Sequence, residues 1–115
     1  MPDFPRDFPR RGEIYWAQLE KVRPVVVVSA DVGNKFSNAV VVAALTSQIP
    51  EKSYPMNVHL PSGEPLEDAG VILCRNLYTF LKEDLGTYRA DLSQEQVAAV
   101  DQALISALEL PKATA

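Results

Sequence analysis

The chain has 115 residues and a mass of 12.7 kDa, a length that suits one compact domain and leaves no room for a second. Apolar residues make up 47% and charged residues 23%, which is typical of a globular domain and argues against a fibrous or wholly disordered chain. The formal net charge of -4 argues against a protein that holds duplex DNA through a generally basic surface. A locally basic binding site is compatible with this charge.

The single cysteine, Cys74, and the single histidine, His59, restrict the disulfide and metal chemistry that we expect. One cysteine cannot form an internal disulfide, and the pair cannot supply the ligand cluster of a structural zinc site. We therefore expect a reduced, cytoplasmic protein without a metal ion or other cofactor, in which Cys74 is inert packing. No apolar run approaches the roughly 20 residues of a transmembrane helix, so we expect no membrane association and no secretory signal.

The first ten residues contain a doubled Asp-Phe-Pro-Arg unit. Proline withholds a backbone donor and disfavours helix in the residue before it. We therefore expect residues 1–10 to form a flexible tail, followed by a single domain at residues 11–110 and a short C-terminal tail at residues 111–115. Arg6, Arg10 and Arg11 form a small basic stretch that could contact RNA or a partner, but we expect these arginines to be solvated.

The next segment reads as a series of strands. Aromatic and β-branched residues predict a strand at 13–18, and four consecutive valines predict a strand buried on both faces at 23–30. Only residues 19–22 connect them. Gly, Asn and Ser at 31–38 indicate a turn before a third strand at 39–45.

The second half contains shorter strands and one clear helix. Alternating apolar and polar residues predict a strand at 56–60, and a buried strand is expected at 70–74. A helical turn within 78–84 and an edge strand at 86–90 follow. Ser93 and Gln96 have the spacing of a capping box, so a helix should begin there and end before Pro111. Short strands with one closing helix indicate a mainly β fold with α, in the form of a small, strongly curved antiparallel barrel.

Three sequence blocks together resemble the MazF/PemK toxin family. They are Arg11-Gly-Glu-Ile-Tyr-Trp, Arg23-Pro-Val-Val-Val-Val-Ser29 and Val40-Val-Val-Ala-Ala-Leu-Thr46-Ser47. The resemblance implies a small SH3-like β-barrel of the MazF/PemK/CcdB type that forms a homodimer. It further implies a toxin-antitoxin function as an mRNA interferase, a metal-independent, sequence-specific endoribonuclease for single-stranded mRNA, with a cognate MazE-like antitoxin as its partner.

The resemblance also implies the site residues. Arg23 matches the family's phosphate-stabilising and acid-base arginine, and Thr46 matches its phosphate-contacting hydroxyl, with Ser47 as a weaker candidate for the same pocket. A guanidinium can bind a phosphate in a bidentate manner, and a threonine adds a neutral hydrogen bond. Glu20, the carboxylate of the short connection, is the candidate catalytic base. The candidate RNA-binding residues also include Lys21, Arg75 and Tyr78.

The chain departs from the family at two places. Residues 19–22 replace a long glycine-containing loop, and Arg75 stands where many members have an aspartate. The departures keep a second function open, in which the barrel only binds a protein, as a CcdB-like gyrase poison or an antitoxin-binding decoy. The chain lacks the aromatic C-terminus of those gyrase poisons.

Three further interpretations concern single side chains. His59 has a suitable ordinary pKa for a general base, but its place on the polar face of a strand predicts exposure. Ser47, His59 and Asp31 lack the local signature of a hydrolase triad. Tyr15 and Trp16 are candidates for base stacking, and strand alternation requires one of them to lie in the core.

Overall fold

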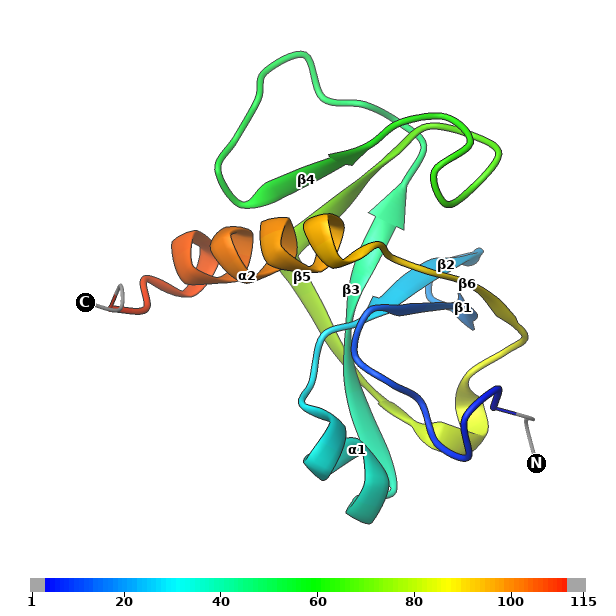
Figure 1. Cartoon of the computed structure of the whole chain (residues 1–115). Coiled ribbons are helices and arrows are strands. Elements are labelled where there is room, and N and C mark those ends of the chain that lie inside the picture. The colour runs from blue at the N-terminus through cyan, green and yellow to red at the C-terminus, as the bar shows by residue number, and fades with distance from the viewer. Residues whose placement is uncertain (1–3, 112–115) are drawn as a thin grey trace.

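The computed structural model describes residues 4–111, which form one six-stranded antiparallel sheet, two α-helices and a short 3-10 helix. The strands are β1 (Glu13–Gln18), β2 (Val22–Val27), β3 (Ala39–Thr46), β4 (Asn57–Leu60), β5 (Gly70–Leu81) and β6 (Tyr88–Asp91). The helices are α1 (Asp31–Phe36), η1 (Lys82–Asp84) and α2 (Gln94–Leu108). The strand order is β4-β5-β3-β2-β1-β6, and Figure 1 shows the sheet curling strongly beside α2. This half-barrel confirms the predicted fold class.

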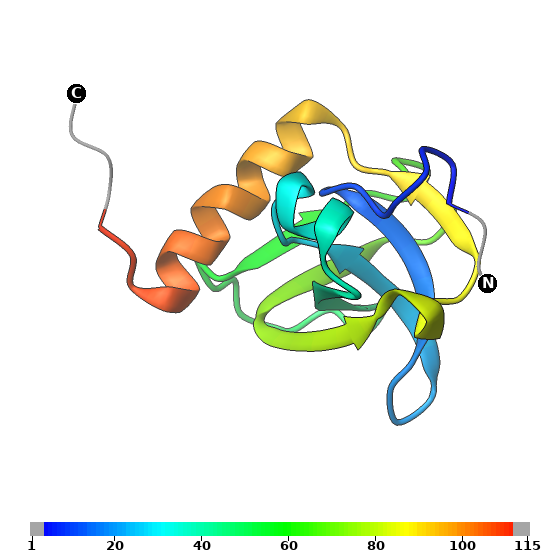
Figure 2. The same cartoon turned by 90° about the horizontal axis from the view of Figure 1, so that it is seen from below.

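The sheet is buried on both faces where β2 and β3 cross its centre. Val26 and Val28 lie in one apolar cluster, between the sheet and α2, while Val25 and Val27 lie in a second cluster on the other face. The predicted burial of the four valines on both faces is therefore confirmed, although β2 ends at Val27 and not at residue 30. Figure 2 shows α2 along one side of the curled sheet and the hairpin that joins β1 to β2 on the opposite side.

Strand β5 is much longer than the five-residue strand expected at 70–74, because it pairs along most of its length with β3. The register shifts between Ala43, which pairs with Leu77, and Ala44, which pairs with Leu73. Such a bulge bends a strand and increases its twist, which helps the sheet to curl. The helical turn expected within 78–84 begins only at Lys82, since the residues before it continue the strand.

The segment expected to be a turn at 31–38 instead contains α1. Asn34 is fully buried there, and its side-chain amide donates to the backbone carbonyl oxygen of Ser29 at 2.9 Å. The Ser29 hydroxyl in turn donates to the side-chain carbonyl oxygen of Asn34. The polar residues that suggested a turn thus stabilise a short helix through side-chain hydrogen bonds.

The arginines before β1 are bound to the domain, so the expectation that Arg6 is solvated is wrong. Its guanidinium contacts Glu13 at 2.6 Å and Asp91 at 2.9 Å. Glu13 is only 1% exposed, and it also accepts hydrogen bonds from the Arg10 backbone and the Tyr15 hydroxyl. A buried carboxylate requires such partners, and the pairing holds this segment against the sheet. Residues 1–3 and 112–115 of the two predicted tails lie outside the described residues.

Helix α2 closes the domain with the predicted capping box. Gln96 N–H donates to Ser93 Oγ at 3.1 Å, and the Ser93 N–H donates to the Gln96 side chain at 2.9 Å. The helix ends at Leu108, where Glu109 adopts a left-handed conformation with φ of 54°, two residues before Pro111. No helix within residues 4–111 is long and apolar enough to cross a membrane.

Candidate active site

The strand register brings Arg23 and Thr46 together. The paired residues of β2 and β3 end at Val25 and Ala44. Arg23 and Thr46 each lie two residues beyond that pair, and both line the pocket that opens there. Two residues that are distant in the sequence therefore meet at one end of the sheet.

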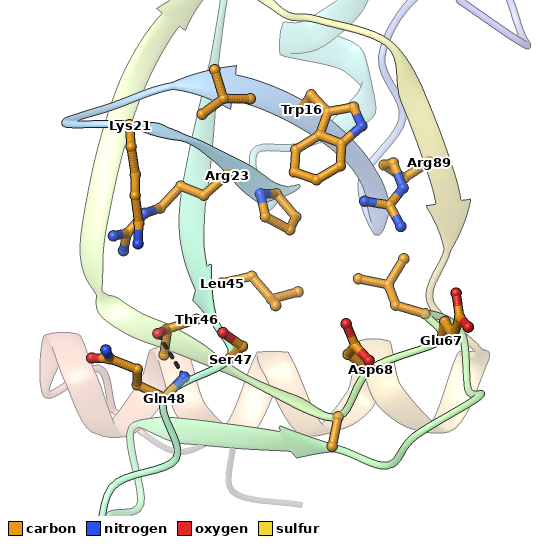
Figure 3. A pocket seen from close by; sticks show the side chains of 14 residues that line it. Trp16, Lys21, Arg23, Leu45, Thr46, Ser47, Gln48, Glu67, Asp68 and Arg89 are labelled. Atoms are coloured by element: carbon orange, nitrogen blue, oxygen red, sulfur yellow. Dashed lines mark hydrogen bonds between the residues drawn. The ribbon is translucent and has the colours of Figure 1, made fainter.

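A pocket of about 420 Å³ opens at this end of the sheet (Figure 3). Its volume is within the range of ordinary small-ligand sites. Its polar lining comes from the hairpin between β1 and β2, the end of β3, the loop before β5 and strand β6. These polar residues are Lys21, Arg23, Thr46, Ser47, Gln48, Glu67, Asp68 and Arg89.

Arg23 and Arg89 are the two half-buried cations of the pocket. Within residues 4–111 the Arg23 guanidinium forms no salt bridge. Its charge is therefore available to an anion bound in the pocket. Figure 3 shows the Arg23 side chain ending beside Lys21, on the same side of the pocket as Thr46 and Gln48. An anion such as phosphate satisfies both the charge and the donor geometry of this arginine.

Thr46 is placed to donate a hydrogen bond to the same ligand. Its Oγ1 accepts a hydrogen bond from the Gln48 backbone N–H at 3.1 Å, which fixes the hydroxyl oxygen at the strand end. A hydroxyl that accepts from a backbone amide keeps its own proton for donation. Ser47 also lines the pocket and is exposed.

The other predicted site residues divide into two groups. Lys21 lines the pocket, whereas Glu20, Arg75 and Tyr78 do not. Glu20 is exposed at the hairpin tip, one residue before Lys21. Arg75 and Tyr78 are exposed on β5, where Val71 is the residue that pairs with Thr46. At about 3.3 Å per residue, Arg75 stands roughly 13 Å along that strand from the level of Thr46.

Three charged pocket residues were not assigned to the site by sequence reasoning. Glu67 and Asp68 come from the loop before β5, and Arg89 comes from β6. The Arg89 guanidinium lies over the Trp16 ring, 4.4 Å from its centroid, which is a cation–π contact. Trp16 was a candidate for base stacking, and it is half-buried in this wall while Tyr15 is the core residue. The contact depends on the pairing of β6 with β1, for which the sequence carries no local signal.

The remaining titratable candidates lie elsewhere. His59 is exposed on β4, outside the pocket, as its alternation predicted. Cys74 is fully buried, and burial raises the pKa of its thiol to about 11, which favours the unreactive protonated form at neutral pH. Burial and a hydrogen bond to Glu13 raise the pKa of Tyr15. Among residues 4–111 no three His, Cys, Asp or Glu side chains are grouped so that they could hold a metal ion.

A family model for the PemK-like, MazF-like toxins of type II toxin-antitoxin systems matches residues 10–108. The chain belongs to this toxin family. The match extends over both strands that carry Arg23 and Thr46, and it confirms the family expected from the sequence blocks. The family match thus covers nearly all of the residues that the structure describes.

Two relatives are informative for the activity of the MazF/PemK-like chain. It is 34% identical over 110 residues to Endoribonuclease EndoA of Bacillus subtilis (strain 168), a match that covers 88% of this chain and 95% of the relative. It is 28% identical to a mycobacterial endoribonuclease solved in complex with its cognate antitoxin, with a TM-score of 0.81 over 91% of this chain and 99% of that one.

A third relative supports the fold. The MazE-MazF structure from Deinococcus radiodurans is 23% identical to this chain and has a TM-score of 0.76. The match covers 95% of this chain and 100% of that one.

Proposed function

We propose that this MazF/PemK-like toxin is a metal-independent endoribonuclease that cleaves single-stranded mRNA at short specific sequences. The observation that carries the proposal is that Arg23 and Thr46 line one pocket, in which Arg23 forms no salt bridge with any residue of 4–111. The endoribonuclease names of the two relatives reported above support it. Because mRNA is translated in the cytoplasm, we also propose that the protein acts there.

The proposed reaction uses the RNA itself as the nucleophile. The 2′-hydroxyl attacks the adjacent phosphorus, a new bond forms to O2′, and the bond to the 5′-oxygen of the next nucleotide breaks. The products are a 2′,3′-cyclic phosphate and a free 5′-hydroxyl. Charge accumulates on the non-bridging oxygens in the transition state, and donors already in place stabilise it without reorganisation. Arg23 supplies charge and a bidentate donor pair, and Thr46 supplies one neutral donor.

The reaction also needs a group that accepts the 2′-hydroxyl proton. We assign this role to Glu20, which is exposed at the hairpin tip, one residue before the pocket-lining Lys21. Arg23 is assigned to donate a proton toward the departing 5′-oxygen. The Arg23 assignment comes from the family resemblance, and the Glu20 assignment from its being the carboxylate of the short connection at 19–22.

The proposed partners use the same surface. Lys21 and Arg23 lie side by side in the pocket of a chain with a net charge of -4, and an acidic antitoxin segment is complementary to these two cations. The antitoxin complex of the mycobacterial relative supports this partner class. We further propose a homodimer, in which Arg75 and Tyr78, exposed on β5, contact RNA beyond the pocket.

The decisive experiment incubates end-labelled single-stranded RNA with the purified protein in excess chelator, beside Arg23→Ala and Thr46→Ala. We expect cleavage at a limited set of sites by the parent and loss of cleavage in both variants. RNA left intact by the parent at all concentrations contradicts the proposal and favours the alternative, a non-catalytic protein that binds a protein target. Cleavage that persists unchanged in both variants refutes this active site.

A further inference from the structure

One wall of the pocket presents a cation that lies over an aromatic ring. The Arg89 guanidinium carbon lies 4.4 Å from the centroid of the Trp16 ring, and in the part of the chain that the structure describes Arg89 forms no salt bridge. Contact with the ring face leaves the hydrogen-bond donors at the guanidinium edge available to a ligand. A guanidinium of this kind offers a planar pair of donors, which a lysine cannot reproduce.

A second wall presents hydrogen-bond acceptors. Glu67 and Asp68 are exposed and line the same pocket from the loop before β5. Figure 3 shows their carboxylate oxygens on the side of the cavity below Arg89. The separation between Arg89 and each carboxylate exceeds 4.0 Å, since neither forms a salt bridge with it. The pocket therefore offers donors from Arg89 and acceptors from Glu67 and Asp68 to one bound group.

Guanine has this arrangement of polar atoms. Its O6 and N7 atoms are neighbouring acceptors that match a guanidinium, and bidentate arginine contact with them is the commonest specific base contact in nucleic-acid complexes. Its N1–H and N2 amino group are donors on the adjacent edge, where ionised carboxylates act as acceptors. Single-stranded RNA exposes both edges at once, because the bases are unpaired.

We propose that this pocket selects a guanosine next to the scissile phosphate, with Arg89 on O6 and N7 and with Asp68 and Glu67 on the N1 and N2 donors. The identification of the ligand as RNA rests on the proposed function. Adenine has an acceptor at N7 but an amino donor at the neighbouring position, so one N–H of the guanidinium would face another donor and have no acceptor. Uracil has a single ring donor for the carboxylates. Cytosine carries its acceptors and its donor on one edge. Neither base can therefore contact Arg89 and the two carboxylates at the same time as well as guanine does.

Binding of uncleavable RNA tests the subsite separately from catalysis. Short 2′-O-methyl oligonucleotides lack the attacking hydroxyl, and Trp16 is the single tryptophan of the chain, so its fluorescence reports occupation of this wall. We compare adenosine oligomers that contain one guanosine, inosine, 7-deazaguanosine or cytidine. We expect the guanosine oligomer to bind on the order of 10-fold more tightly than the others, because inosine lacks the N2 donor and 7-deazaguanosine lacks the N7 acceptor. Equal affinity for all four overturns the proposal.

Two variants assign the contacts. Arg89→Lys keeps the charge but loses the donor pair, so it should remove the preference for guanosine over 7-deazaguanosine while the overall affinity falls little. Asp68→Asn should reduce the preference for guanosine over inosine, and Asp84→Asn, a surface change on η1, should leave both preferences unchanged. Unchanged preferences in Arg89→Lys and Asp68→Asn refute the assignment. Guanosine-selective binding without cleavage of ordinary RNA refutes the ribonuclease proposal alone, whereas cleavage without any guanosine preference refutes this subsite alone.

Discussion

Arg23 and Thr46 each lie two residues beyond the last pair of β2 and β3, Val25 with Ala44, at the end of the sheet where the pocket opens. The central valines of β2 are buried on both faces, so a one-residue slip of this strand would exchange its two apolar faces. The core therefore fixes the register, and the register brings Arg23 and Thr46 to the same end of the sheet. The buried valines, which take no part in catalysis, therefore determine where Arg23 and Thr46 lie.

Replacement of Arg23 by lysine separates charge from geometry. A lysine at this position would keep a positive charge but would lose the planar donor pair that matches a phosphate. We expect Arg23→Lys to lower the cleavage rate on the order of 10-fold or more, and Arg23→Ala to lower it by roughly 100- to 1000-fold. Single-turnover cleavage of labelled RNA measures both, with Lys35→Ala on α1, outside the pocket, as the control. A lysine variant as fast as the parent would show that only the charge matters.

Replacement of Thr46 tests whether the hydroxyl acts on the substrate. Thr46→Val keeps the shape but removes the donor and the acceptor for the Gln48 N–H, and we expect a loss of roughly 100-fold in cleavage rate. Thr46→Ser keeps the hydroxyl and should retain most of the activity. Circular dichroism and thermal unfolding of both variants check that the fold is preserved. Equal rates for valine and serine would remove Thr46 from the mechanism.

Replacement of Glu20 tests the proposed proton acceptor. Glu20→Gln keeps size and polarity but cannot take a proton, so cleavage should slow by at least about 100-fold if this carboxylate is the general base. The affinity for 2′-O-methyl RNA should stay the same, because the proposed role concerns the attacking hydroxyl alone. Glu51→Gln, in the exposed loop after β3, is the matched control. An undiminished rate in Glu20→Gln would refute the assignment.

The ion pair of Arg6 with Glu13 predicts a stability effect far from the pocket. Arg6→Ala leaves the carboxylate of Glu13, which is 1% exposed, without its cation, and we expect a loss of about 1–3 kcal/mol in the free energy of unfolding. Asp91→Asn breaks only the exposed half of the network and should cost less than about 1 kcal/mol. Urea unfolding monitored by Trp16 fluorescence measures both. Equal losses in the two variants would contradict the dominant role of Glu13.

The features that could be predicted from the sequence are those with local causes. Four valines in a row require burial on both faces, and Ser93 with Gln96 encodes the start of α2 through hydrogen bonds within four residues. The family resemblance also named Arg23 and Thr46 together, and both line the pocket. The strands thus followed from local patterns, whereas the two central pocket residues followed from the resemblance.

The features that were missed depend on contacts between distant segments. The second half of β5 carries Arg75, Asn76 and Thr79, which are exposed and lack an apolar alternation, and it is a strand because β3 pairs with it. Arg89 reaches Trp16 only because β6 pairs with β1 at the edge of the sheet. No local propensity encodes such neighbours, so the second wall of the pocket could not be derived from the sequence.

The buried Cys74 predicts a loss of stability in alkaline solution. Burial raises the pKa of its thiol from an ordinary value of 9.0 to about 11, so the folded state retains the proton at a pH where the unfolded state has released it. The contribution to stability is complete below pH 9 and is lost as the pH rises from about 9 to 11, by up to about 3 kcal/mol. Tyr15 acts in the same direction above pH 10, because burial and its bond to Glu13 raise its pKa.

The contributions of Cys74 and Tyr15 to the loss of stability can be distinguished by the pH range in which each occurs and by substitution of Cys74. Urea unfolding at intervals from about pH 7.5 to 10 samples the range in which Cys74 titrates in the unfolded chain, while the Tyr15 contribution begins only at the upper end of that range. We expect the free energy of unfolding to fall across this interval in the parent and to fall less steeply in Cys74→Ala, whose stability is lower at neutral pH because a buried side chain is shortened. Parallel pH dependences in the two proteins would show that the thiol is not the group responsible.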